Sequence, residues 1–371
     1  MSIYEELGVR TLINAAGTVT RYGGSLMAPE VLDSMRGASQ QFCYLDEVQQ
    51  KVGERIAAML EVEAAYVTSS AACGLVLTTA ACMAGTDPAK IEQLPDTTGM
   101  KHEVIIQKIH RIAYDQAIRV AGGTLIEIDD QGTPPTEDMR RAINENTAAI
   151  FFMATVMNHP ASVPLDEVVA MARAASVPVV VDAASECPPV STLTRFWEAG
   201  ADLIIFSGGK SIMGPQSTGL VIGRKDLIAG CAANGVPFAT VGRPMKVSRE
   251  EMIGFMKALE LYLGRDHEAD TARWTAQLDY IEAALQGIPN ITVGRFTKSE
   301  TYTIPLLYIR PEAGANFTRS MIAEALEAGD PAIVVGQHFT EDSVTINPHN
   351  LQPGQEQIVA ERCKAVLDQI G

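Results

Sequence analysis

Lys210 is the residue of this sequence whose surroundings most directly suggest covalent chemistry. It follows an apolar run that ends at Phe206, and a Ser-Gly-Gly turn over residues 207–209 leads into it. The Gly-Lys-Ser triplet also occurs in phosphate-binding P-loops, but that motif needs a glycine at position 204, where this chain has Ile204. A lysine at the end of a strand is suited to forming a Schiff base with a carbonyl compound, once burial and neighbouring charges lower its pKa.

Pyridoxal 5′-phosphate (PLP) is a carbonyl cofactor that such a lysine can bind, and its binding requires an acid beside the pyridine nitrogen. Asp182 suits this role, because it ends an apolar strand upstream of the lysine, where an acid points toward the mouth of a sheet. The phosphate requires backbone N–H donors at a helix N-terminus. Residues 68–72, Thr-Ser-Ser-Ala-Ala, open an uncharged helix with Ser69 or Ser70 as its N-cap, and Ser207 adds a hydroxyl. Together these features predict a PLP site.

The elements that must position these residues alternate between short β-branched or aromatic runs and stretches of helical period. Strands are expected around residues 104–106, 124–128, 149–153, 178–181, 202–206 and 219–222, with helices over 136–144 and 165–175 between some of them. Apolar strands separated by helices are typical of a parallel α/β sheet covered on both faces. The last of these strands follows its predecessor through a loop alone, so we expect it to be an antiparallel neighbour.

The C-terminal part has a different pattern. Two long helices are expected over residues 248–264 and 266–285, followed by short strands around 291–293, 303–308, 333–335 and 344–346 and a closing helix over 355–370. This order indicates a smaller α+β domain. We therefore expect an N-terminal segment over residues 1–14, a large α/β domain over 15–250, and a linking helix with the small domain over 251–371.

Composition excludes several classes of function. The chain has 371 residues with 29 Lys and Arg against 45 Asp and Glu, a formal net charge of −16, which argues against a nucleic-acid partner. The six cysteines form no C-x-x-C pair and no histidine has zinc-finger spacing, so no metal is expected. The longest uncharged apolar stretch, residues 69–85, is too short for a membrane span, and the start lacks a signal-peptide core. We expect a reduced, cytoplasmic, soluble protein.

The sequence resembles fold-type I PLP-dependent enzymes, in the branch of selenocysteine synthase and D-glucosaminate-6-phosphate ammonia-lyase. The resemblance covers nearly the whole chain and is carried by residues 9–24, 110–116, 181–184, 206–223 and 242–247. The lysine segment is specific to the fold type. The stretches Ile-Asn-Ala-Ala-Gly-Thr-Val-Thr-Arg and Gly-Arg-Pro-Met-Lys-Val point to the ammonia-lyase-like branch. The resemblance implies a mainly parallel seven-stranded sheet domain with a smaller C-terminal domain.

The resemblance also implies roles for individual residues. Lys210 would hold PLP as a Schiff base and remove the α-proton of the substrate, and Asp182 would pair with the pyridinium. The phosphate would be held by Ser69, Ser70, Ala71, Ala72 and Ser207. His110 or Tyr114 would lie against the ring face, although His110 could equally be a satisfied, partly buried histidine.

The substrate anion lacks an obvious partner, because no arginine of the small domain lies in a motif of the family. The candidates are Arg21, Tyr22, Arg111, Arg243 and Lys246. Arg243 and Lys246 precede the helix expected at 248, where a surface pair and a substrate anchor are both open interpretations. Glu186, just past Asp182, either tunes the site or faces solvent.

The implied reaction is α-proton removal and β-elimination from an amino acid or amino-sugar acid, giving a 2-oxo acid and ammonia. Racemisation and aldol cleavage remain alternatives, because the same carbanion leads to each. A selenocysteine synthase-like transferase is a further alternative, which the acidic composition and the start of the chain at the catalytic core argue against. The last alternative is a protein that binds the cofactor but has no catalytic activity. The resemblance implies at least a homodimer, with residues 18–24 and 214–218 near the interface, and a small-molecule amino substrate.

Overall fold

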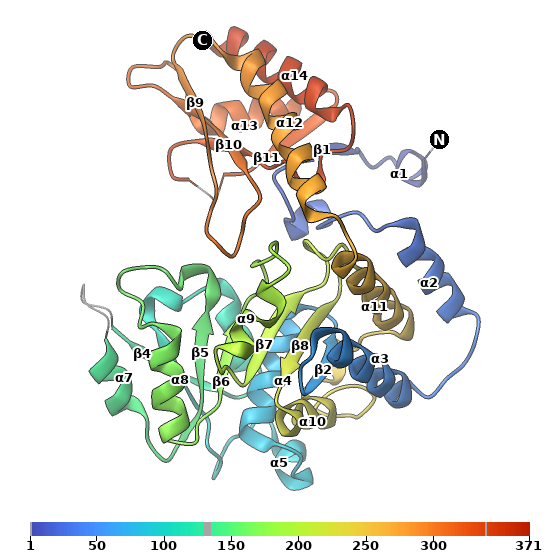
Figure 1. Ribbon diagram of the computed structural model, residues 1–371, viewed down its shortest axis with the longest axis vertical. Helices are drawn as coiled ribbons and strands as arrows, with labels where there is room; N and C mark the ends of the chain where they lie inside the picture. The colour runs from blue at the N-terminus through green and yellow to red at the C-terminus, as the bar shows by residue number, and fades with distance from the viewer. Residues whose placement is uncertain (1, 130–134, 338–339) are drawn as a thin grey trace. The chain divides into compact units, whose positions relative to one another are not determined.

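The computed structural model describes residues 2–129, 135–337 and 340–371, and the chain divides into two compact units (Figure 1). The large unit is Met27–Gly264, and the small unit combines Met1–Leu26 with Arg265–Gly371. These bounds differ from the expected segments 1–14, 15–250 and 251–371 in two places. Residues 15–26 belong to the small unit, and residues 251–264 belong to the large unit.

The large unit is built on a seven-stranded sheet of order β2-β8-β7-β6-β5-β3-β4. Its strands are β2 (Ala64–Thr68), β3 (Glu103–Gln107), β4 (Thr124–Ile128), β5 (Thr147–Met153), β6 (Val179–Asp182), β7 (Leu203–Ser207) and β8 (Gly219–Gly223). Strands β3 to β7 are parallel, while β8 is antiparallel to both β7 and β2. The expected mainly parallel sheet is therefore confirmed, with β2 as an added edge strand that the apolar pattern did not reveal.

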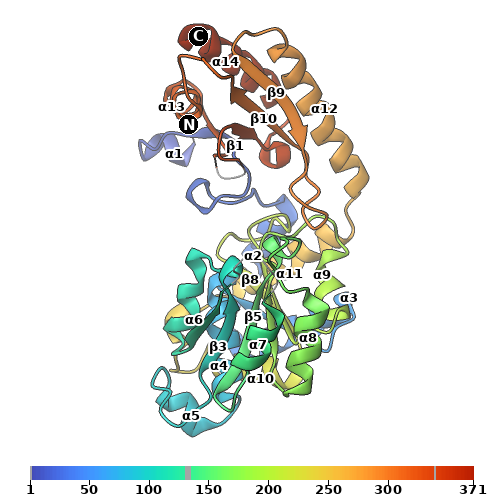
Figure 2. The ribbon, with the colours of Figure 1, turned by 90° about the vertical axis from the view of Figure 1, so that its left-hand side faces the viewer.

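Both faces of this sheet are buried. Along β5, Ile150 and Phe152 pack into one hydrophobic core, whereas Phe151 and Met153 pack into the other. Successive side chains of a strand therefore point alternately into two buried cores. This explains why the strands are continuous apolar runs in the sequence. Figure 2 shows helices on either side of the strands.

The helices of the large unit complete these two cores. Side chains from α4, α6 and α10 line one core, and side chains from α3, α7, α8, α9 and α11 line the other. The helices of the unit are α2 (Pro29–Ser39), α3 (Leu45–Leu60), α4 (Ala71–Ala84), α5 (Pro88–Gln93), α6 (Gln116–Val120), α7 (Thr136–Ala142), α8 (Leu165–Ala174), α9 (Thr192–Glu198), α10 (Lys225–Ala233) and α11 (Arg249–Leu263).

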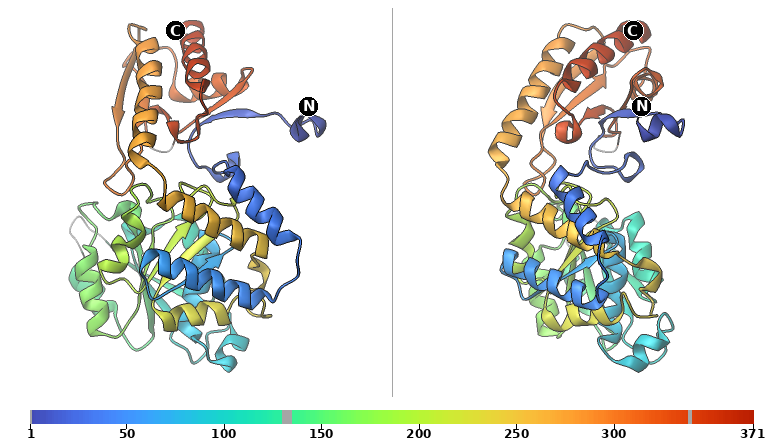
Figure 3. Two further views of the ribbon diagram at one scale, coloured as in Figure 1. Left: turned by 45° about the vertical axis from the view of Figure 1, so that its right-hand side comes forward. Right: turned by 90° about the vertical axis from the view of Figure 1, so that its right-hand side faces the viewer.

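The two long helices expected before the small domain are present, and each has a side-chain cap. Ser248 and Glu251 form a capping box at the start of α11, and Asp266 caps α12 (His267–Leu285) by accepting from the Ala269 N–H. Helix α11 packs against α2 and α3 (Figure 3), which explains why it belongs to the large unit.

The small unit has a three-stranded antiparallel sheet of order β12-β10-β9 and a separate pair in which β1 and β11 run parallel. Its strands are β1 (Leu12–Ala15), β9 (Ile291–Phe296), β10 (Leu306–Pro311), β11 (Ala332–Val335) and β12 (Val344–Ile346), and its helices are α1 (Ile3–Glu6), α12, α13 (Arg319–Ala328) and α14 (Gln355–Ile370). Because β1 pairs with β11, the N-terminal segment is part of this unit.

Candidate active site

Lys210 lies in a turn between β7 and β8 whose shape is set by backbone contacts. The Gly208 N–H donates to the Thr218 carbonyl at 2.8 Å, and the Met213 N–H donates to the Lys210 carbonyl at 2.9 Å. A Cβ atom on Gly208 would collide with the Thr218 hydroxyl, and one on Gly209 would lie 2.5 Å from Cα of Gln216. The two glycines before the lysine are therefore required by close approach of the returning chain.

Asp182 ends β6 on the strand next to the lysine turn, opposite Ile205 of β7. Its carboxylate is buried and accepts a hydrogen bond from the Ala184 N–H at 3.0 Å. Burial raises the pKa of Asp182 above its usual value, and the positive charge of Lys210 acts in the opposite direction. The predicted acid and the predicted lysine therefore lie in one electrostatic environment at the carboxyl edge of the sheet.

The N-terminus of α4 presents backbone donors. Ser70 caps the helix by accepting from the Cys73 N–H at 3.0 Å, and its carbonyl accepts from the Gly74 N–H at 3.0 Å. An α-helix leaves its first four N–H groups without partners within the helix. The Ser70 hydroxyl satisfies the donor of Cys73, and the helical bonds begin at Gly74, so the N–H groups of Ala71 and Ala72 are directed out of the helix end. Such an end attracts anions.

Gly219 brings this helix end close to the lysine strand. It is paired with Ser207 on β7 and with Thr68 on β2, so it lies between the lysine strand and the strand that leads into α4. A Cβ atom at this position would lie 2.5 Å from the carbonyl carbon of Ser70 and 2.6 Å from the Ala71 nitrogen. The absence of a side chain therefore permits the predicted phosphate donors to approach the strand that carries Ser207.

Ser69 connects this helix end to the segment of the candidate anion ligands. Its hydroxyl donates to the Met245 carbonyl at 2.8 Å, and Met245 ends a 3-10 turn over Arg243–Met245. Arg243 and Lys246 are both exposed. The structure thus places two cationic residues beside the start of α4.

His110 is fully buried and has partners for both ring nitrogens. Nδ1 accepts from the Met153 N–H at 3.0 Å, so Nε2 carries the hydrogen and donates to the Ser162 hydroxyl at 2.8 Å. Its ring meets Phe152 edge-on, with centroids 4.6 Å apart. Burial lowers the pKa of His110 to about 4, with a smaller effect of His159, so the ring is neutral. These contacts match the interpretation of a satisfied histidine, while Tyr114 is exposed.

Arg111 is already engaged by carboxylates. Its Nε lies 2.5 Å from Asp115, and its Nη1 forms an ion pair with Glu127 on β4. A substrate anion would have to compete with both of these groups. Arg111 is therefore less available to a substrate anion than the exposed Arg243 and Lys246.

Arg21 and Tyr22 lie in the small unit, in a 3-10 turn over Thr20–Tyr22. Buried Asn350 closes the base of their loop, because its Nδ2 donates to the carbonyls of Gly17 at 3.1 Å and Gly24 at 2.9 Å. Sequence reasoning did not single out Asn350, since its partners lie more than 300 residues away in the chain.

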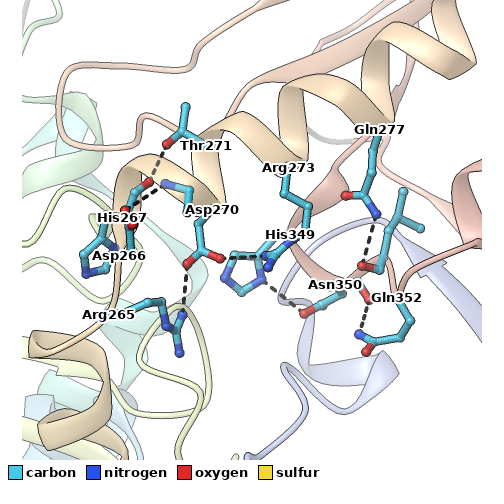
Figure 4. A network of polar contacts seen from close by, with 12 residues as sticks. Arg265, Asp266, His267, Asp270, Thr271, Arg273, Gln277, His349, Asn350 and Gln352 are labelled. Carbon is cyan, nitrogen blue, oxygen red and sulfur yellow. Dashed lines mark hydrogen bonds and ion pairs between the residues drawn. The ribbon is translucent and has the colours of Figure 1, made fainter.

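Contacts behind this clamp fix its orientation (Figure 4). Because Nδ2 of Asn350 is the donor to the loop, its Oδ1 accepts from Nδ1 of His349 at 3.1 Å. Burial lowers the pKa of His349 to about 4. On α12, Asp270 forms ion pairs with Arg273 at 2.9 Å and Arg265 at 3.7 Å.

In residues 2–129, 135–337 and 340–371, no group of three or more His, Cys, Asp or Glu side chains could hold a metal ion. Within the same ranges, no helix is long and apolar enough to cross a membrane.

The fold is that of fold-type I PLP-dependent enzymes, and the comparisons with known proteins agree. The chain belongs to the aminotransferase class-V family, which it matches over residues 33–344. Proteins of this family are PLP-dependent enzymes, so the predicted resemblance, fold and cofactor are confirmed.

Two curated relatives match almost the whole chain. A 5′-C-glycyluridine monooxygenase-decarboxylase of Streptomyces sp is 31% identical over 98% of this chain and 92% of that protein. A D-glucosaminate-6-phosphate ammonia lyase of Salmonella typhimurium is 30% identical over 99% of this chain and 98% of that protein. A solved structure of D-glucosaminate-6-phosphate ammonia-lyase covers 100% of this chain and 99% of its own, with 28% identity and a TM-score of 0.85.

The residues present fit PLP. The start of α4 supplies N–H donors suited to a phosphate, and the space that a Cβ of Gly219 would fill is kept clear beside it. Asp182 is a buried carboxylate whose raised pKa would be relieved by a cationic ring nitrogen, and Lys210 supplies the amine.

Proposed function

We propose that this chain is a PLP-dependent ammonia-lyase acting on an amino acid or amino-sugar acid. It would remove the α-proton and expel the β-substituent, releasing a 2-oxo acid and ammonia. The observation that carries the proposal is that Asp182 and Lys210 follow neighbouring parallel strands at the edge of the sheet where α4 begins. This pair occurs in a chain that is 30% identical over its length to an ammonia lyase.

Residues of this chain would bind the cofactor and transfer the protons. PLP supplies an electron-poor ring that stabilises negative charge on the substrate α-carbon. The N–H groups of Ala71 and Ala72, with the hydroxyls of Ser70 and Ser207, would hold its phosphate, and ionised Asp182 would keep a proton on its ring nitrogen. Nζ of Lys210 would accept the α-proton and, once protonated, donate a proton to the departing hydroxyl.

A substrate anion would be recognised by Arg243 and Lys246. Ser69 supports this assignment, because its hydrogen bond to Met245 holds their segment beside α4. Arg21 and Tyr22, on the loop that Asn350 clamps, are the further candidates. We infer that the substrate carries a negatively charged group beyond its carboxylate, such as a phosphate.

The decisive experiment offers D-glucosaminate-6-phosphate to the purified protein with PLP and measures ammonia and 2-oxo acid. Stoichiometric formation of both products supports elimination. Exchange of the α-proton for solvent deuterium without ammonia would indicate racemisation, and an aldehyde product would indicate aldol cleavage. A protein that develops no visible absorbance with PLP would contradict the enzymatic proposal altogether.

A second candidate activity rests on the relative of 31% identity, whose name describes oxidative decarboxylation of a glycyluridine. The same protein is therefore offered 5′-C-glycyluridine in an oxygen electrode. Oxygen uptake with release of carbon dioxide would favour this activity over ammonia release.

We further infer that the enzyme is a cytoplasmic homodimer. Phe42 is 100% exposed and Tyr44 is 79% exposed in the link between α2 and α3, and Leu32 on α2 is 44% exposed. Exposed large apolar side chains can form association surfaces where they lie together. The expected interface segments 18–24 and 214–218 stay part of the proposal. Analytical ultracentrifugation should show a dimer that a double substitution, Phe42→Asp with Tyr44→Asp, converts to a monomer.

A further inference from the structure

Glu186 is a buried carboxylate that none of the roles above uses. It is 1% exposed, so of the two interpretations open from the sequence, solvent exposure is wrong. Its Oε1 accepts hydrogen bonds from the Thr155 hydroxyl at 2.6 Å and from the Ser185 hydroxyl at 3.1 Å. Burial of a carboxylate is costly even with such partners, which suggests a role beyond packing.

The contacts of Glu186 lie at the edge of the sheet where the cofactor is expected. Thr155 belongs to a 3-10 turn over Ala154–Val156 that follows β5, and Glu186 belongs to the segment that follows β6. These strands are parallel neighbours, so their carboxyl ends meet at one edge. In open α/β sheets, ligands bind outside the carboxyl ends of the strands.

A hydrogen bond ties the chain after Glu186 to the chain after Lys210. The hydroxyl of Ser211 donates to the carbonyl of Cys187 at 2.6 Å, and both residues are buried. Glu186 and Lys210 each precede one member of this bonded pair. The glutamate is therefore held near the lysine turn by the backbone itself.

The charge of Glu186 acts on Asp182. Burial is the main reason why the pKa of Asp182 is raised, the charge of Lys210 opposes that rise, and the charge of Glu186 adds to it. The state of Asp182 therefore depends on Glu186 as well as on Lys210.

Two further titratable neighbours are uncharged. His110, which contacts the end of β5, is neutral because burial lowers its pKa to about 4. The thiol of Cys187 is neutral because burial raises its pKa to about 12.

We propose that Glu186 is a positioning residue whose negative charge, acting through Asp182 and Lys210, favours the protonated state of the cofactor site. A negative charge at this place makes it easier to keep a proton on the pyridine nitrogen and on the nitrogen of Lys210. This inference rests on the proposed PLP-dependent function.

The test is a spectrophotometric pH titration of the visible absorbance of the cofactor bound at Lys210. E186Q keeps an oxygen that can accept from Thr155 but removes the charge. The midpoint should fall by about one pH unit, the lower end of the effect of a neighbouring charge at close range. E198Q, a substitution of an exposed glutamate on α9, should leave the midpoint unchanged.

The outcomes separate the inference from the proposed function. If the wild-type protein forms no absorbance band with PLP, the proposed function fails. If the wild-type band titrates and the E186Q midpoint coincides with it, Glu186 is only a structural residue and the inference is overturned.

A second variant, T155V, tests the same inference if E186Q does not fold. T155V removes the hydroxyl that donates to Glu186 and retains the side-chain shape, so the negative charge of Glu186 is stabilised by one hydrogen bond fewer. Its midpoint should lie between those of wild type and E186Q. If E186Q does not fold, a T155V midpoint below that of wild type supports the inference, and an unchanged one overturns it.

Discussion

Lys210 and Asp182 are electrostatically coupled across two neighbouring parallel strands. The positive charge of the lysine lowers the pKa of the aspartate carboxyl, which burial raises. Asp182 ends β6 and Lys210 follows β7, so the sheet brings together an acid and an amine that are separated in sequence. The coupling links the protonation state of one residue to that of the other.

Replacement of Lys210 by alanine should remove both the visible absorbance of the bound cofactor and turnover. The amine is the group that would hold PLP covalently and move the α-proton, so the loss of turnover should be at least about 100-fold. Lys90→Ala, at an exposed position on α5, is the matched control. Activity close to that of wild type in the K210A variant would remove this lysine from the mechanism.

Gly219→Ala should weaken cofactor binding. The added methyl group would lie 2.5 Å from the Ser70 carbonyl carbon and would displace the start of α4. We expect a PLP dissociation constant raised by about 10-fold or more, and overpacking that lowers the free energy of unfolding by about 1–3 kcal/mol.

Gly37→Ala provides the control for this substitution, because no atom lies within 4 Å of the added Cβ on helix α2. It should bind PLP as wild type does and unfold at slightly higher temperature, since alanine favours a helix. Equal affinities of both variants, measured by fluorescence titration, would argue against close approach at Gly219.

His110 should make the protein less stable in acid. Burial lowers its pKa from 6.5 to about 4, so below pH 6.5 the unfolded chain binds a proton that the folded chain excludes. Its stabilising effect is complete above pH 6.5 and is lost as the pH falls toward 4. At pH 5 the loss is about 2 kcal/mol.

Urea unfolding at pH 7.5 and pH 5, at one fixed PLP concentration, measures this effect. The free energy of unfolding of the wild-type protein should fall by about 2 kcal/mol more than that of His110→Asn. If the two proteins depend on pH equally, His110 does not carry the linkage.

Asn350→Ala should release the loop that carries Arg21. The buried carbonyl of Gly24 would lose its Asn350 donor, at a cost of about 1–3 kcal/mol, while that of Gly17 would keep Asn14 and Val19 as donors. Trypsin should then cleave after Arg21 faster than in wild type. Asn146→Ala changes an exposed asparagine and should leave the cleavage rate unaltered. Cleavage of the N350A variant at the wild-type rate would show that the clamp does not order the loop.

The meeting of Lys210 and Asp182 at one edge of the sheet was predictable because its signals are local. Lys210 and Asp182 each follow a buried apolar strand, and parallel neighbouring strands end at one edge whatever their distance in sequence. The boundaries of most strands and of the closing helix were also predictable, because their apolar patterns continue to the ends.

Contacts between distant segments were not predictable. The pairing of Arg111 with Asp115 has helical spacing, but its pairing with Glu127 depends on β4 lying beside β3. The burial of Glu186 requires the turn after β5, and the clamp by Asn350 requires the two ends of the chain to meet. The periodicity of a single stretch of sequence does not reveal contacts between residues that are far apart in the chain.

The pairing of β1 with β11 has a consequence for synthesis of the protein. The ribosome releases β1 early, but its partner strand, Ala332–Val335, emerges only after all of Met27–Gly264 has been made. The nascent large unit can complete its sheet while β1 is still unpaired. The large unit, which carries Lys210, is therefore synthesised first. The small unit can complete its fold only when the last hundred or so residues have been synthesised.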